Sequence, residues 1–466
     1  MNEKSISVVD ESKHPVHTVV FLAWPIFLEQ LLVSLVQAVD TAMVGSLGKI
    51  ATASVAINSS PNNLINGVLM AMGIGFTSLI ARSIGANENE RARRLIKQAV
   101  MVVFYIGIPL SVLYFFLAGD IPRWLGGEDE ILTMARQYNK IIAVSLAFRG
   151  MTTMLTAIYR GYGDSRTPMV TNVLVNCLNV VGNYLCIYPT REITVFGEAF
   201  TMIGLGWGVA GAAFSTSVSN ILGGLILLVL CFTKKSEMQI SFTSGFKTDR
   251  QEMRNVFRIS FPAMLERFAM QGSFIMMTYT VASLGTAAIA ANNLSGTIES
   301  LSFMPGFAFG MAMTTLFGQA LGARRPDLAR LYVINTIKLG SMVMAFTSLF
   351  LFFGSGTVIR LFTPDADVIE MGSTLLKILA VIQIPQMITM VFSGSLRGAG
   401  DSKSSFIIVL ISMWGVRVLG SIICVRVLHL GLFAVCVCTC VDNVVRCCLF
   451  YLRYRQGKWK TVNANT

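Results

Sequence analysis

Charged residues are scarce in this sequence of 466 residues, and their scarcity argues against a soluble protein. Asp, Glu, Lys and Arg make up 13% of the chain, whereas hydrophobic residues make up 54% and the mean hydropathy is +0.64. Soluble domains average about 25% charged residues. The composition therefore indicates a protein that crosses a membrane many times, since each helical crossing needs about 20 mostly apolar residues.

Histidine is rare as well, and cysteine does not cluster as metal ligands do. Of the three histidines, His14 and His429 fall outside the apolar stretches and His17 lies at the very start of the first one. Most of the nine cysteines lie within the last two apolar stretches, without the convergent spacing of a zinc site, and we interpret them as small apolar residues. A membrane-embedded enzyme would need a metal or nucleophile constellation. We therefore expect a protein without enzymatic activity and without a cofactor.

Short polar breaks divide the apolar part of the chain into twelve stretches. The polar residues 1–18 do not resemble a cleavable signal peptide. Lys and Arg concentrate in the segments on the N-terminal side of the membrane, and positively charged loops stay cytoplasmic. We therefore expect a protein of the cytoplasmic membrane with both termini cytoplasmic. The expected spans are residues 16–44, 51–81, 95–118, 138–159, 168–189, 206–232, 259–285, 288–318, 331–353, 370–396, 405–425 and 431–452.

The net charge of +12 mostly reflects this cytoplasmic belt of basic residues. It includes RARR at 91–94 and RYRQGKWK at 453–460. Such a belt suits anionic membrane lipids, and we do not expect a nucleic-acid partner. The expected domain plan has a cytoplasmic tail at 1–15, a cytoplasmic linker at 233–258 and a second cytoplasmic tail at 453–466.

The chain is a tandem duplication. The string RGYGDSR at 160–166 recurs as RGAGDSK at 397–403, an offset of 237 residues. Each copy holds six expected spans, an even number, so both copies enter the membrane in the same orientation. We predict an all-α fold of two six-helix lobes, residues 16–232 and 259–452, related by a pseudo-twofold axis along the membrane normal. Other pairs at the same offset are Pro25 and Pro262, Glu29 and Glu266, and Gly73 and Gly310.

The repeated RGxGDS string is interpreted as a turn. It follows the fourth span of each half, where Gly permits a tight turn and Asp and Ser can cap the next helix. Its Arg adds positive charge on the cytoplasmic side.

A polar cluster is present in the first half and absent from the second. Asp40 lies within the first span, and its counterpart is Met277. An ionised carboxylate within a span costs roughly 2.5 to 3.5 kcal/mol on insertion scales, so it seldom lacks a partner or a task. The fifth span places four Asn residues on one helical face. These are Asn172, Asn176, Asn179 and Asn183, whose counterparts are Val409, Met413, Val416 and Gly420.

Two interpretations of this cluster remain. In the first, the Asn residues join helices by hydrogen bonds and Asp40 is a buried member of the network. In the second, Asp40 binds and releases a proton or Na⁺ as the protein changes shape. We favour the second, because one half lacks every member of the cluster.

Other acids within the spans are candidates for binding a substrate. Glu29 and Glu266 each follow a span-interrupting Pro by four residues, and both structural and functional roles are open for them. Glu299 belongs to the C-terminal half alone and can contact a cationic ligand. We expect Asp442 and Arg446, four residues apart, to pair within their helix, with Arg417 as a further partner. The full set of candidate substrate-binding residues is Glu29, Gln37, Glu266, Glu299 and Asn176.

Several motifs together resemble the multidrug and toxic compound extrusion (MATE) family. They are WPIFLEQLLVSLVQAVDTAMVGSLG from Trp24, GVAGAAFST at 208–216, GQALGARRPDLA from Gly318, the doubled RGxGDS and the terminal RYRQGKW. The resemblance covers nearly the whole chain. It implies two lobes in a V around a central cavity, and export chiefly of organic cations in exchange for H⁺ or Na⁺. It also implies that Asp40 is the first-helix acid of the family, with Asn179, Asn183 and Thr216 around it.

The chain also departs from some members of that family. It has Asn183 where some archaeal members have an Asp. The only acidic residue of its tenth span is Glu370, at the outer edge of the span. Hard cations such as Na⁺ want several oxygen ligands. The sequence thus looks closer to the DinF-like branch, and we favour H⁺ coupling, with Na⁺ near Asp40 as the alternative.

Alternatives to drug export are weaker. A flippase for a lipid-linked saccharide would want a cationic cavity for pyrophosphate, whereas the spans expected to line the cavity offer acids and little positive charge beyond Arg267. A membrane-embedded enzyme is less favoured still. We therefore expect a monomeric antiporter that exports small organic cations by alternating access.

Overall fold

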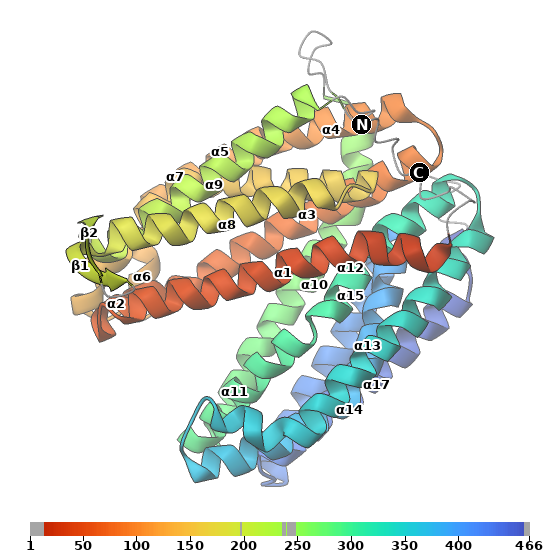
Figure 1. Ribbon diagram of the computed structural model, residues 1–466. Coiled ribbons are helices and arrows are strands. Elements are labelled where there is room, and N and C mark those ends of the chain that lie inside the picture. Colours follow the sequence, from red (N-terminus) through yellow and green to blue (C-terminus); the bar gives the residue numbers. More distant parts are fainter. Residues whose placement is uncertain (1–13, 196–197, 235–238, 240–247, 461–466) are drawn as a thin grey trace.

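The computed structural model describes residues 14–195, 198–234, 239 and 248–460, and most of them are helical (Figure 1). The helices of the N-terminal lobe are α1 (Pro15–Gly45), α2 (Lys49–Ala56), α3 (Ser59–Gly85), α4 (Asn89–Val102), α5 (Ile108–Leu117), α6 (Asp120–Trp124), α7 (Asp129–Tyr162), α8 (Arg166–Ile187) and α9 (Gly208–Thr233). Those of the C-terminal lobe are α10 (Arg250–Ala282), α11 (Thr286–Ser302), α12 (Met304–Gly322), α13 (Pro326–Arg360), α14 (Ala366–Gly398), α15 (Ser402–Leu410), α16 (Leu419–Ile422) and α17 (Leu432–Arg455).

The predicted twelve-helix, two-lobe fold is confirmed. Ten helical segments are long and apolar enough to cross a membrane, and α11 with α12, bent by 48° at their junction, makes an eleventh. The twelfth, α10, falls short of that test because Glu266 and Arg267 lower its hydropathy. Pro305 opens α12 at the bend, where a residue without a backbone N–H is tolerated.

Some helices extend beyond the expected spans. α10 begins at Arg250, within the segment 233–258 that was expected to be a linker, and α17 reaches Arg455. Most of the remaining linker, together with residues 1–13 and 461–466 of the tails, lies outside the described residues.

The loop between α8 and α9 contains a β-hairpin that the sequence did not lead us to expect. Strand β1 (Pro189–Val195) pairs antiparallel with β2 (Glu198–Leu205), with an irregularity between Pro189 and Arg191. The Arg191 guanidinium stacks over the rings of Tyr188 and Tyr184, 4.0 and 4.6 Å from their centres. The hairpin is thereby tied to the end of α8, one of the helices that carry the polar cluster.

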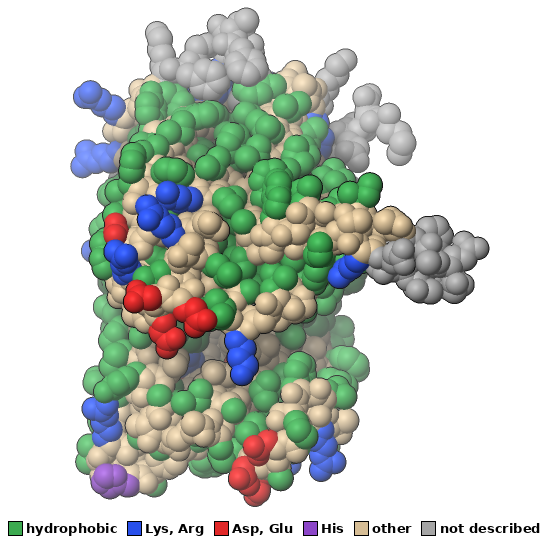
Figure 2. Space-filling view, turned by 90° about the vertical axis from the view of Figure 1, so that its left-hand side faces the viewer, with side chains coloured by type: hydrophobic (Ala, Val, Ile, Leu, Met, Phe, Trp, Pro, Cys, Tyr) green, Lys and Arg blue, Asp and Glu red, His purple; other side chains and the backbone are tan. Residues whose placement is uncertain are grey.

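The two lobes form a V (Figure 1). They converge near the two chain termini, which we call the closed end, and diverge towards α2, the hairpin and α11, which we call the open end. Seen from the open end, a hollow separates the lobes, and hydrophobic side chains dominate their flanks (Figure 2). Such flanks suit contact with lipid.

Each lobe packs around the beginning of the other lobe's first helix. The core of the C-terminal lobe includes Val19, Leu22 and Ile26 of α1, all 2% exposed or less. Conversely, Val256 and Ile259 of α10 belong to the core of the N-terminal lobe. This exchange holds the closed end together by burial of apolar side chains.

Glycines bring α3 and α12 into backbone contact at the closed end. A Cβ atom added to Gly85 would lie 2.0 Å from the Gln319 carbonyl oxygen, and one added to its repeat partner Gly322 would lie 2.1 Å from the Arg82 carbonyl oxygen. Only glycine fits such an approach. Two further hydrogen bonds join these helices to the opposite lobe: Ser78 Oγ of α3 donates to the Gly398 carbonyl of α14 at 3.2 Å, and its repeat partner Thr315 of α12 donates to the Arg160 carbonyl of α7 at 2.8 Å.

Candidate functional site

The repeated glutamates each contact the arginine of the RGxGDS string in their own half. Arg160 Nη2 lies 2.7 Å from Glu29 Oε2, and Asn172 Nδ2 donates to Glu29 Oε1 at 2.7 Å. Arg397 Nη2 pairs with Glu266 Oε1 in the same way. Both Glu side chains are at least 96% buried. The arginines of the two strings therefore point into the protein, where each pairs with a glutamate of α1 or α10, and do not lie on the surface of a loop.

The aspartates of the two strings form the turn that the sequence predicted. Gly163 and Gly400 have φ values of +101° and +80°. Asp164 Oδ1 accepts hydrogen bonds from the backbone N–H groups of Arg166 and Thr167, and Asp401 Oδ1 accepts one from Ser404. These bonds supply partners for N–H groups at the start of the following helix.

Each aspartate also binds the end of its lobe's last membrane helix. Lys234 Nζ lies 2.8 Å from Asp164 Oδ2, and Arg453 Nη2 lies 2.6 Å from Asp401 Oδ2. Burial alone would raise the pKa of Asp164, but the hydrogen bonds from Lys234 and Thr167 outweigh it and lower that pKa below 3.8. The string thus joins three helices of each lobe.

The predicted polar cluster forms around Asp40, at the open half of α1. Asn183 Nδ2 donates to Asp40 Oδ1 at 2.5 Å. The Asn179 amide is assigned the orientation in which both of its ends have suitable hydrogen-bond partners. Its nitrogen then donates to both Asp40 oxygens, at 3.1 and 3.2 Å, and its oxygen accepts from Thr216 Oγ1 at 3.3 Å. The structure thus brings together all four predicted coupling residues, from α1, α8 and α9.

The surroundings of this carboxyl group are set by close packing of α8 on α9. Ser215 Oγ donates to the Asn179 carbonyl at 2.9 Å, and a Cβ at Gly182 would lie 2.5 Å from that hydroxyl. Asn179 and Asn183 are 5% and 1% exposed, whereas Asp40 is half-buried. The amides are therefore fixed, and the carboxyl group stays partly accessible.

The amides present donors to Asp40, and this limits what the site can hold. A carboxylate that accepts two N–H groups has few free lone pairs for a hard cation, which needs several oxygens. Asn183 Oδ1 is a buried acceptor without a hydrogen-bond partner among the described residues. A protonated carboxyl group gains an O–H donor that needs such an acceptor. In the described part of the chain, no group of three or more His, Cys, Asp or Glu residues could hold a metal ion.

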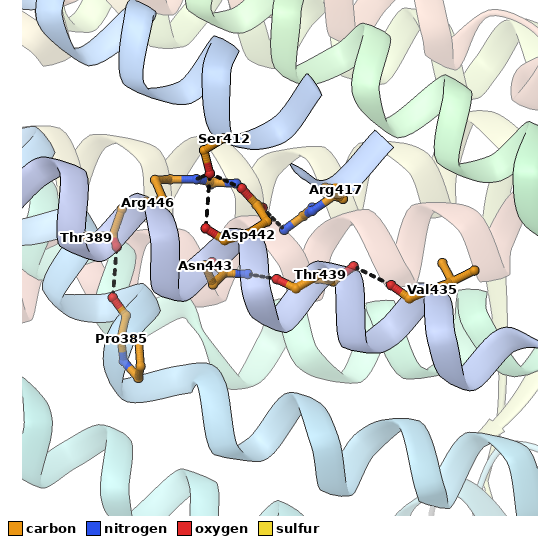
Figure 3. Close-up of polar contacts among 9 residues, drawn as sticks. All are labelled: Pro385, Thr389, Ser412, Arg417, Val435, Thr439, Asp442, Asn443 and Arg446. Atoms are coloured by element: carbon orange, nitrogen blue, oxygen red, sulfur yellow. Dashed lines mark hydrogen bonds and ion pairs between the residues drawn. The ribbon is translucent and has the colours of Figure 1, made fainter. Parts of the chain in front are cut away.

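The C-terminal lobe contains a different buried polar group, in which the acid is neutralised (Figure 3). Asp442 pairs with Arg446 one turn later on α17, and Arg417 Nη2 lies 2.9 Å from Asp442 Oδ2. Ser412 Oγ also donates to Asp442. The predicted pairing of these three charged residues is confirmed, and with both arginines within ion-pair distance of it the acid has no free charge to offer a ligand.

A cavity lies between the lobes, near the closed end of the cleft. It encloses about 720 Å³, including the space open to solvent, and helices of both lobes form its wall. Three arginines line it: Arg160 from α7, Arg397 from α14 and Arg267 from α10. The rest of the wall is mostly apolar or hydroxylic: Met70, Gly73, Ile74, Thr77, Thr153, Ala157, Phe307, Gly310, Met311, Thr314 and Met390.

None of the five candidate substrate residues lines this cavity. Glu29 and Glu266 lie behind the arginines that do, Gln37 is exposed on α1, and Glu299 and Asn176 are half-buried elsewhere on α11 and α8. Our sequence analysis missed Arg160 and Arg397. The signal that could have found them is the repeat itself, because an acid in the first helix and an arginine in the fourth recur together.

Comparisons with known proteins agree with this architecture. The family model MatE matches residues 25–185 and again 262–423, one match in each half. The probable multidrug resistance protein NorM of Thermotoga maritima is 29% identical over 444 residues, which are 94% of this chain and 92% of that protein. A crystal structure of MATE in complex with MaD3S has a TM-score of 0.90 at 22% identity, covering 99% of both chains. An outward-facing conformation of a multidrug resistance MATE family transporter has a TM-score of 0.89 at 22% identity and 99% coverage of both chains. The solved structures share the fold of this chain. Because the family model matches both halves, the chain belongs to the MatE family of membrane transporters, which is the family that its motifs resemble.

Proposed function

We propose that this protein exports small amphipathic molecules from the cytoplasm, organic cations among them, in exchange for protons. Both termini lie on the cytoplasmic side of the cytoplasmic membrane, where most Lys and Arg would then lie. The closed end of the V is then cytoplasmic, and the cleft opens outward. The relatives named as multidrug resistance proteins support export of drug-like substrates.

The observation that carries the coupling proposal is the cluster around Asp40. Its carboxyl group faces two buried amides in the N-terminal lobe, whereas the same positions of the C-terminal half hold Met277, Val416 and Gly420. A titrating group can drive a conformational change only if its two protonation states favour different conformations. Asp40 meets that requirement, because its ionised form needs the amide N–H donors and its neutral form needs an acceptor.

Protons suit this site better than Na⁺. The nearest side chains present N–H groups to the carboxylate, so the oxygens that Na⁺ would need are not in place. We therefore favour H⁺ as the coupling ion. This choice agrees with the resemblance of the sequence to the DinF-like branch of the family, to which we propose that the chain is closer.

Organic cations would be held by acids that form no ion pair within 4.0 Å among the described residues. Glu299, with Gln37 and Asn176 as polar contacts, fits this role better than Glu29 and Glu266, which already bind Arg160 and Arg397. A single chain contains both lobes and the cleft between them, so the proposal needs only a monomer in the membrane.

Asp40→Asn tests the proposal, because it keeps shape and hydrogen bonding but removes titration. Purified wild-type protein in liposomes should export an organic cation when an imposed pH gradient drives it, without Na⁺. The variant should fold and insert normally and lose that export. Full pH-driven export by the variant would refute the role of Asp40. Export that needs Na⁺ and does not respond to the pH gradient would identify Na⁺ as the coupling ion instead of H⁺, without refuting the role of Asp40.

A further inference from the structure

The cavity at the closed end of the cleft carries more positive than negative charge. Three guanidinium groups line it, from Arg160, Arg397 and Arg267. Two carboxylates, Glu29 and Glu266, stand directly behind the first two. One positive charge in the wall of the cavity is therefore not balanced by these contacts.

Arg267 is the arginine that supplies the unbalanced charge. It follows Glu266 in the sequence, but Glu266 turns its Oε1 to Arg397. Among the described residues, no carboxylate oxygen lies within 4.0 Å of an Arg267 nitrogen, and no hydrogen bond links its side chain to another residue. The side chain is half-buried in the cavity wall. A charge in such surroundings costs free energy unless a partner or a ligand compensates it.

The repeat shows that this charge is not part of the common architecture. Nearly all of the wall comes in pairs that the duplication relates, such as Met70 and Phe307, Gly73 and Gly310, and Thr77 and Thr314. Arg267 breaks the pattern, since its counterpart in the first half is Gln30. The two-lobe fold can therefore be built with a neutral amide at this place.

The other side chains of the wall suit an amphipathic molecule with an anionic group. Met70, Phe307, Met311 and Met390 offer adaptable apolar contacts. Thr77 and Thr314 add hydroxyl groups. A guanidinium group matches carboxylate and phosphate oxygens, which it can bind through two parallel hydrogen bonds.

We propose that Arg267 anchors a carboxylate or phosphate group of the transported molecule, so that this cavity binds amphipathic anions and zwitterions. The proposal rests on the export function above and extends its substrates beyond organic cations. The anion would bind on the axis between the lobes, where it would contact helices of both at once.

Binding measurements with matched probes test this proposal. The probes share one fluorescent aromatic core and carry a quaternary ammonium, a carboxylate, or both. Arg267→Gln, which installs the residue of the other half, should weaken binding of the carboxylate and zwitterionic probes at least about tenfold. The ammonium probe should change by less than about twofold, since it has no group for Arg267 to bind. Arg267→Lys keeps the charge and should retain most of the binding of both acidic probes.

Arg426→Gln serves as the control. It removes one arginine near the open end of the C-terminal lobe, where the guanidinium lies 5.2 Å from the centre of the Tyr279 ring, and it should change no probe. Equal weakening of all three probes by Arg267→Gln, or no change in the acidic probes, would overturn the proposal. A dodecyl phosphate probe and a polyprenyl pyrophosphate probe distinguish the source of the anion. Arg267-dependent binding of the second alone would assign the cavity to a lipid headgroup.

Binding is measured without a gradient, so the result is independent of the coupling experiment. A selective loss of acidic probes in Arg267→Gln, together with intact pH-driven export by Asp40→Asn, would refute proton coupling through Asp40 and leave the anion site standing. The opposite pair of results would refute the anion site alone.

Discussion

At the scale of single residues, the duplication separates the groups that build the protein from those that distinguish its halves. The Glu29 and Arg160 pair recurs as Glu266 and Arg397, with 131 residues between the partners in both halves. Removing one partner of a buried pair leaves an uncompensated charge and typically costs 3–5 kcal/mol, on the order of a small protein's whole stability. Such a repeated pair reads as structural. Asp40, Glu299 and Arg267 have neutral counterparts and form no ion pair within 4.0 Å among the described residues, so they are the candidates for function.

The amides around Asp40 should influence transport more than stability. Asn183→Ala removes the 2.5 Å hydrogen bond to the carboxylate, a loss of about 1–3 kcal/mol for a buried charged acceptor. We expect proton-driven export in liposomes to fall about tenfold or more, with the protein still folded. Asn179→Ala should act in the same direction. The matched control is Val416→Ala, at the repeat position of Asn179, which should lower the melting temperature and leave the pH dependence of export unchanged. Equal loss of export in all three variants would mean that the amides only pack helices.

At the scale of elements, the turn after the fourth membrane helix of each lobe is fixed by charge as well as by backbone conformation. Asp164 caps α8 and binds Lys234 at the end of α9, so one carboxylate holds three helix ends in register. Asp401 and Arg453 do the same in the C-terminal lobe. The turn therefore transmits the position of the last helix of a lobe to its fourth and fifth.

The contact at Asp164 should make stability depend on pH. Because the pKa of Asp164 is lowered below 3.8 in the folded protein, the ionised carboxylate contributes stability above about pH 3.8, and the contribution is lost as the pH falls through the folded-state pKa. Asp164→Asn keeps a capping side chain but removes the charge, and it should cost about 1 kcal/mol or less at pH 7. Thermal unfolding in detergent measures the difference.

The difference between wild type and Asp164→Asn should shrink as the pH falls through the folded-state pKa of Asp164, which lies below 3.8, because both side chains are then uncharged. Lys234→Met should reproduce the loss at pH 7, since it removes the same ion pair. A difference between wild type and variant that stays constant from pH 7 down to the lowest pH at which the wild type still folds would contradict the electrostatic explanation.

The sequence predicted these elements better than the directions of their side chains. Hydropathy and the 237-residue offset yielded twelve spans, two lobes and the capping role of the aspartates. They did not indicate that Arg160 and Arg397 turn inward, because an arginine at a helix end usually reaches for water or lipid headgroups. Its direction here is set by a glutamate 131 residues away. The hairpin β1 and β2 was missed for a similar reason: its pairing lies between spans, where hydropathy carries no signal.

At the scale of the whole molecule, the two halves share one architecture and differ in charge. The N-terminal lobe holds an acid among amides near the open end, and the interface between the lobes holds an unbalanced arginine near the closed end. They lie at different depths between the open and closed ends and carry opposite charge. A proton on Asp40 and an anionic group at Arg267 would thus each bias the cleft without competing for one site, which is how two ligands can be coupled through a shared conformational equilibrium.

The glycine contact at the closed end should control that equilibrium. Gly85→Val or Gly322→Val would place a side chain about 2 Å from a carbonyl oxygen of the facing helix, so α3 and α12 must separate. We expect populations to shift from the V described here towards conformations open at the end where the termini lie. Spin labels on cysteines at Glu90 and Asp327, two exposed positions on opposite lobes, should then report longer distances in a cysteine-free background. The matched control is Gly356→Val on α13, where nothing lies within 4 Å of the added Cβ, and it should leave the distances as they are. Unchanged distances in both closed-end variants would show that the glycine contact does not set the opening of the molecule.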